Sequence, residues 1–275
     1  MLLQRILTAV PLAILAIWFI LTQSSDALFY ALLVVVFIAA WEWAQLAGLN
    51  SIVSRIIYAL LVLGVTYLSC TLLDQVYLSW FKLLMLAAFV WWLFVIYRMS
   101  TSEPKAASDT SSLAKMFTGF LILIPPVLAL VYIHQSPDGA HWLLYSLVIV
   151  WIADSGAYFS GKKFGKRKLA LKISPGKTVE GLYGAVMATT IYTFAAALFF
   201  ELDLMQTVML LIIGFFATLI SVAGDLYISL LKRERGVKDS GSILPGHGGV
   251  LDRIDSITSS APFFALFLGM MVFNV

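Results

Sequence analysis

Residues 205–235 read MQTVMLLIIGFFATLISVAGDLYISLLKRER, and this stretch decides the fold class. Its first 27 residues contain one charged side chain, Asp225, and the run then ends on a basic group. About 20 mostly apolar residues are enough for a helix to cross the hydrocarbon core of a bilayer. The stretch therefore predicts a transmembrane helix that ends at a membrane surface and carries one acid inside it.

The same character extends through the chain, whose 275 residues are 61% hydrophobic and 12% charged, with a mean hydropathy of +0.95. Soluble chains are about 25% charged. Apolar runs long enough to be spans cover about 5–22, 27–47, 55–73, 78–97, 115–133, 141–160, 178–200, 205–231 and 257–274. Because lipid offers the backbone no hydrogen bonds, we expect an all-α polytopic integral membrane protein with about nine transmembrane helices.

The basic residues lie on one side of this alternating topology. Of the 18 Lys and Arg residues, 17 precede the first span or lie in the connectors after spans two, four, six and eight, and Lys82 is the exception. Loops rich in Lys and Arg stay in the cytoplasm. We therefore expect the N-terminus and the large loops to be cytoplasmic and the C-terminus to lie outside.

Acidic side chains gather near the cytoplasmic ends of the last four predicted spans. Asp154 and Asp225 each precede the cytoplasmic end of their span by about six residues, or ~9 Å of helix. Glu180 opens span seven from that side, and Asp252 and Asp255 come just before span nine. Converging carboxylates repel one another unless a cation lies between them, and such hard oxygen ligands suit Mg²⁺. The pattern predicts a metal site near the cytoplasmic surface.

Two plainer interpretations compete with a metal site. A single acid near a membrane boundary can pair with a nearby Lys or Arg. Glu42, between Trp41 and Trp43, is typical of an interfacial anchor in an aromatic belt. We therefore leave Glu42 out of the predicted site.

The connector after span six contains SGKKFGKRKLALKISPGK at residues 160–177, with seven basic residues and no acid. Such a cluster can attract anionic lipid headgroups. Lys177 and Thr178 then stand at the expected start of span seven, where free backbone N–H groups favour a phosphate. This is not a Walker A loop, because Leu171 occupies the position of its first glycine.

A second polar connector, KDSGSILPGHGGVLDRIDS at residues 238–256, precedes span nine. Its Gly246, Gly248 and Gly249 allow backbone amides to approach an anion closely, and they flank His247. The single cysteine, Cys70, excludes an internal disulfide and a C-x-x-C metal site. These features indicate chemistry on phosphates with a divalent metal, at the cytoplasmic membrane surface.

The stretch from Ser229 to Asp255, SLLKRERGVKDSGSILPGHGGVLDRID, resembles the signature of the phosphatidate cytidylyltransferase (CDP-diacylglycerol synthase) family. DSGAYFSGKKFGK at 154–166 and SPGKTVEG at 174–181 are similar to the same family. The resemblance implies that CTP and phosphatidate react to CDP-diacylglycerol and pyrophosphate, with Mg²⁺ and room for a second cation such as K⁺. It also implies the bacterial inner membrane and a homodimer, and no nucleic acid as a partner.

The resemblance and the charge pattern together nominate site residues. The metal candidates are Asp225 and Asp252, with Asp255 and Asp154 to orient metal or basic partners. The catalytic candidates are Asp225, Asp252, Lys232, His247, Lys238 and Arg253. The substrate-binding candidates are Ser174, Lys177, Thr178, Ser229, Arg233, Asp239, Gly246, Gly248 and Gly249. On this interpretation residues 1–135 form an N-terminal region of five spans, and residues 136–275 form the catalytic region of four spans.

Other functions make different predictions. A CTP-dependent polyprenol or lipid kinase would use similar metal and nucleotide chemistry but transfer the γ-phosphoryl group. An ion-coupled transporter would place its acids near the bilayer midplane on broken helices. A scaffold without chemistry would leave the aspartates and the glycine-framed His247 unexplained.

Overall fold

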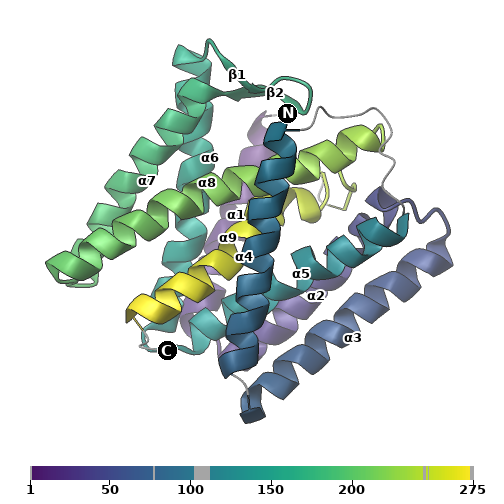
Figure 1. Cartoon of the computed structure of the whole chain (residues 1–275), viewed down its shortest axis with the longest axis horizontal. Helices are drawn as coiled ribbons and strands as arrows, with labels where there is room; N and C mark the ends of the chain where they lie inside the picture. The colour runs from purple at the N-terminus through teal and green to yellow at the C-terminus, as the bar shows by residue number, and fades with distance from the viewer. Residues whose placement is uncertain (1, 77, 102–111, 244–245, 247, 273–275) are drawn as a thin grey trace.

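The computed structural model describes residues 2–76, 78–101, 112–243, 246 and 248–272. These residues form nine α-helices and one two-stranded sheet (Figure 1). The helices are α1 (Leu2–Thr22), α2 (Ser25–Leu46), α3 (Ile52–Val76), α4 (Leu78–Thr101), α5 (Ser112–Gln135), α6 (Gly139–Phe164), α7 (Val179–Phe199), α8 (Leu204–Glu234) and α9 (Leu251–Val272). The strands are β1 (Lys168–Ala170) and β2 (Ser174–Thr178). The prediction of an all-α polytopic membrane protein is confirmed.

In the part of the chain that the structure describes, eight helices, α2 to α9, are long and apolar enough to cross a membrane. Helix α1 contributes a shorter apolar stretch, Val10–Thr22, so the ninth span stays a prediction. Large apolar side chains such as Ile191, Leu198 and Phe199 are exposed on the outer helices. Such a surface needs an apolar surrounding, which a bilayer provides.

Helix ends differ from the predicted spans because hydropathy marks the apolar part of a helix and not its hydrogen-bonded ends. Helix α8 continues to Glu234 and therefore carries Lys232 and Arg233. Helix α9 begins at Leu251, six residues before the predicted span. The connector after α6 forms a β-hairpin in which Lys168 pairs with Thr178. Polar residues at the end of α8, at the start of α9 and in the hairpin therefore have regular secondary structure outside the apolar runs.

Small residues set the closest helix contacts. Helix α6 packs along α7, and a Cβ added at Gly184 would overlap the side chain of Ser160. A Cβ at Gly156 would lie 2.9 Å from the Gly184 carbonyl oxygen. Small residues are the usual means of close helix packing in membranes. This packing positions the hairpin that joins the two helices.

The N-terminal and C-terminal helices are in direct contact. Helix α5 packs against α9 and α2, and α2 also contacts α9. The Lys115 ammonium at the start of α5 lies 3.0 Å from Glu234 at the end of α8. The Trp43 indole in turn donates to the carbonyl of Lys115, over 2.9 Å. The helices before and after residue 135 therefore pack against each other, and the division into two regions stays a prediction.

Candidate active site

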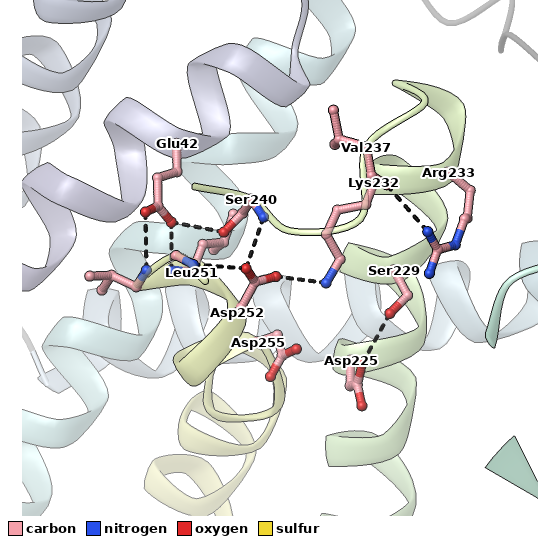
Figure 2. Close-up of polar contacts among 12 residues, drawn as sticks. Glu42, Asp225, Ser229, Lys232, Arg233, Val237, Ser240, Leu251, Asp252 and Asp255 are labelled. Atoms are coloured by element: carbon pink, nitrogen blue, oxygen red, sulfur yellow. Dashed lines mark hydrogen bonds and ion pairs between the residues drawn. The ribbon is translucent and has the colours of Figure 1, made fainter. Parts of the chain in front are cut away.

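The candidate site lies where α8 ends, α9 begins and the β-hairpin approaches (Figure 2). Asp225 stands on α8, and the Ser229 hydroxyl donates to its Oδ1 over 3.1 Å. Residues four apart on a helix share a face. Asp225 and Ser229 therefore share one face of α8.

The hairpin brings a cation to Asp225. The Lys177 ammonium on β2 lies 2.7 Å from Asp225 Oδ2, and both side chains are about one-quarter exposed. Thr178 caps α7, and its hydroxyl oxygen accepts from the Gly181 amide over 3.0 Å. The predicted start of span seven is confirmed. In this structure Lys177, on β2, forms an ion pair with Asp225 on α8.

Asp252, in the first turn of α9, is held on three sides. Its Oδ1 lies 2.6 Å from the Lys232 ammonium, and its Oδ2 accepts from the amides of Ser240 and Gly249 over 2.8 and 3.0 Å. The side chains of Lys232 and Asp252 are 10% and 5% exposed. An ion pair this buried needs further hydrogen bonds to offset the loss of hydration, and here the loop amides supply them.

The other two candidate metal ligands, Asp154 and Asp255, interact electrostatically with Asp225. The charge of Asp225 acts on Asp255 and on Asp154, which places the three carboxylates within electrostatic range of one another. Figure 2 shows Asp225 and Asp255 in the space between α8 and α9. Among the described residues, no three His, Cys, Asp or Glu side chains are close enough to form a metal site by themselves. Mg²⁺ usually takes one or two carboxylates plus water and substrate phosphates, so the oxygen donors still fit it.

Glu180 is used elsewhere. Its carboxylate accepts from the amides of Lys166 and Arg167 over 3.0 and 3.1 Å, and it pairs with the Arg167 guanidinium at 2.9 Å. The hydrogen bond to Glu180 raises the pKa of Arg167, so this exposed guanidinium stays charged. Glu180 therefore closes the base of the hairpin, whereas we expected it to join the converging carboxylates.

The remaining candidates line the solvent side of the same region. Arg233 donates from Nε to the Ile173 carbonyl and from a terminal nitrogen to the Val237 carbonyl, each over 3.3 Å. Lys238, Asp239, Gly246 and Arg253 are exposed. Ser174 opens β2 and is half-buried. Gly246 and Gly248 have φ of +75° and +83°, values that favour glycine. His247 lies outside the described residues.

The sequence interpretation of Glu42 as an interfacial anchor is wrong. Its side chain, on α2, is 1% exposed, and it binds the connector between α8 and α9 through Ser240, Val250 and Leu251 (Figure 2). The rule that an ionisable residue inside a span marks a functional site could have found it. The flanking tryptophans favoured the wrong interpretation.

Known proteins are similar to this chain over nearly its whole length. A model of the Cytidylyltransferase family matches residues 3–271. Proteins named phosphatidate cytidylyltransferase from Haemophilus influenzae and Pseudomonas aeruginosa are each 40% identical, over 97% and 98% of this chain and 98% and 97% of theirs. A protein of the same name from Bacillus subtilis is 45% identical over 48% of this chain and 49% of its own. The chain therefore belongs to the cytidylyltransferase family.

Proposed function

We propose that this protein is a phosphatidate cytidylyltransferase, which converts CTP and phosphatidate to CDP-diacylglycerol and pyrophosphate. One observation carries the proposal: Asp225 and Asp252, on adjacent membrane helices, each pair with a lysine at a site flanked by two basic connectors. The relatives that bear this name match the chain over nearly its whole length. The site has the charges needed for a nucleotide and a lipid headgroup, and it lies near one end of a bundle of apolar helices.

The reaction needs positioning and charge neutralisation more than covalent help from the protein. A phosphate oxygen of phosphatidate attacks the α-phosphorus of CTP, the new P–O bond forms, and the bond to pyrophosphate breaks. Lys232, Arg233, Lys238 and Arg253 neutralise the triphosphate and the leaving pyrophosphate. Lys177 and the hairpin hold a second phosphate near Asp225. No acyl-enzyme or phospho-enzyme is required.

Asp225, with Asp255 or Asp154, would hold Mg²⁺ together with substrate phosphates. Bound Mg²⁺ supplies charge stabilisation to the attacking and leaving oxygens. Asp252 is bound by Lys232 and two loop amides, so its contact with a cation depends on Oδ1, the oxygen that faces Lys232. A second cation such as K⁺ stays a prediction of the family resemblance.

We propose that the site lies at the cytoplasmic surface of a bacterial inner membrane. The one-sided distribution of Lys and Arg supports this orientation, with the N-terminus in the cytoplasm and the C-terminus outside. Soluble CTP then reaches the site from the cytoplasm while phosphatidate arrives from the bilayer. A homodimer is proposed from the family resemblance alone.

The test uses detergent-solubilised protein, Mg²⁺, phosphatidate and CTP labelled at the α-phosphorus. We expect label to move into the organic phase with one pyrophosphate released per lipid labelled, and we expect Asp225→Asn to abolish both. A parallel reaction with γ-labelled CTP and a polyprenol tests the kinase. Transfer of the γ-label to the polyprenol, with no α-label in phosphatidate, would overturn the proposal.

A further inference from the structure

Glu42 is a buried acid outside the proposed reaction chemistry, and it reaches the catalytic region from the N-terminal helices. Its Oε1 accepts from the Val250 amide over 3.0 Å, and its Oε2 accepts from the Leu251 amide over 2.8 Å. The first amides of a helix have no partner within the helix and carry partial positive charge. A carboxylate from α2 therefore caps the start of α9.

Glu42 and Asp252 divide one run of backbone amides between them. The Gly249 amide donates to Asp252, whereas the next two amides donate to Glu42. Ser240 joins the two carboxylates as well, because its amide donates to Asp252 Oδ2 and its hydroxyl donates to Glu42 Oε2, each over 2.8 Å. Figure 2 shows both acids hydrogen-bonded to Ser240.

Glycines in the connector make room for Glu42. A Cβ added at Gly241 would overlap Glu42 Oε1, and one added at Gly249 would overlap both Glu42 Oε2 and Ser240 Oγ. The sequence predicted that Gly246, Gly248 and Gly249 let the backbone approach an anion. At Gly241 and Gly249 that anion is a carboxylate of the protein itself.

We propose that Glu42 is a positioning residue that holds the connector between α8 and α9, and through it orients Asp252 toward Lys232. With Oδ2 tied to the Ser240 and Gly249 amides, the other oxygen of Asp252 faces Lys232 and the site. The inference rests on the proposed function and deepens it, because it gives α2 a part in the cytidylyl-transfer site.

The first variant is Glu42→Gln, which keeps the size of the side chain but turns one acceptor into a donor. The new NH₂ group would face an N–H or O–H donor, so at least one of the three hydrogen bonds is lost. The matched control is Val36→Ala, on the same helix and 2% exposed, which creates a cavity without touching the connector. Ser240→Ala, which removes one donor to Glu42, is the second variant if Glu42→Gln does not accumulate.

Two readouts separate positioning from general loss of stability. Hydrogen exchange of the full chain in detergent, read by mass spectrometry, follows the amides of residues 249–251. Steady-state kinetics gives kcat per folded protein and KM for CTP and phosphatidate. In Glu42→Gln we expect the amide hydrogens of residues 249–251 to exchange faster than in the wild type. We expect kcat to fall about 10–100-fold, because misplacement of a reacting group by about 1 Å can cause such a loss, and KM to stay within about threefold of the wild-type value.

Val36→Ala should keep wild-type exchange at these amides and wild-type kcat per folded protein. The inference is overturned if Glu42→Gln retains wild-type amide exchange, if exchange rises while kcat stays unchanged, or if Val36→Ala lowers kcat equally. If Ser240→Ala is used in place of Glu42→Gln, the same results for amide exchange and kcat support or overturn the inference. If the wild type itself transfers no cytidylyl group, the proposed function fails, while the exchange data still decide whether Glu42 holds the connector.

Discussion

The two polar connectors of the catalytic region have similar compositions and different structures. Both contain Gly, Ser, Pro and several basic residues. The connector between α8 and α9 carries Ser240 at 2% exposure, and its amides bind two buried acids. Lys162 and Lys163 at the end of α6, and Lys166, Lys168 and Lys172 in the connector to α7, are exposed, whereas the less exposed Lys177 pairs with Asp225.

This difference separates two tasks that phosphate chemistry needs. Acids that orient a cation must be held rigidly, and the buried backbone amides of one connector do this for Asp252. Cations that attract a charged substrate act over a longer range and can remain in solvent. The comparison can be tested in both regions, by disturbing the buried residues of the α8–α9 connector and by neutralising the exposed lysines around the hairpin.

The largest effect is expected from removing either aspartate charge. Asp225→Asn and Asp252→Asn should each lower label transfer from CTP about 100-fold or more, because both acids organise charge at the reacting phosphates. Their stabilities should differ. Breaking the buried Lys232–Asp252 pair costs about 3–5 kcal/mol, whereas the more exposed Lys177–Asp225 pair contributes about 1 kcal/mol or less. Thermal unfolding in detergent checks this, and equal midpoints for the two variants would contradict the comparison.

An intermediate effect is expected from adding one methyl group at a buried position of the α8–α9 connector. Gly249→Ala should lower the unfolding midpoint, by an overpacking cost of about 1–3 kcal/mol, because its Cβ would overlap Glu42 and Ser240. Gly176→Ala in the hairpin is the matched control, because a Cβ there meets nothing within 4 Å. We expect the control to keep wild-type stability and activity. A neutral Gly249→Ala would show that the connector can shift without cost.

The smallest effect is expected from the exposed lysines. Replacing Lys162, Lys163 and Lys166 together by Gln should raise KM for CTP about threefold at low salt and leave kcat unchanged, because solvated charges attract the substrate without aligning it. At about 0.5 M salt the difference should vanish, since screening shortens the reach of these charges. Lys82→Gln, near the start of α4, is the control. A fall in kcat that persists at high salt would place these lysines in the reacting site.

Local patterns in the sequence predicted the helices and the residues that carry chemistry. Length and hydropathy predicted each helix, because a span needs an unbroken apolar run. Helical periodicity also relates Ser229 to Asp225, four residues before it on α8. The predicted span nine began only at residue 257, whereas α9 begins at Leu251 and therefore includes Asp252 and Asp255.

The partners of each charged side chain could not be predicted in this way. Glu42 and Ser240 are 198 residues apart, and no local periodicity relates them. The hairpin was not predicted, because strands of three and five residues are too short to show a recognisable alternation of apolar and polar residues. Glu180 pairs with Arg167 at the base of the hairpin. Its position at a helix start had instead suggested that it joins the converging carboxylates near the cytoplasmic surface.

By itself the sequence determined that this chain is a bundle of membrane helices with acids and bases collected at one end. Apolar runs and charge asymmetry depend only on how each local segment interacts with lipid and water, so they can be recognised without knowing the fold. The tertiary structure decided that Lys177 meets Asp225, that Lys232 meets Asp252, and that an acid on α2 caps α9. Those pairings depend on how the helices pack, because a buried carboxylate takes whichever donors the packing brings within hydrogen-bond distance.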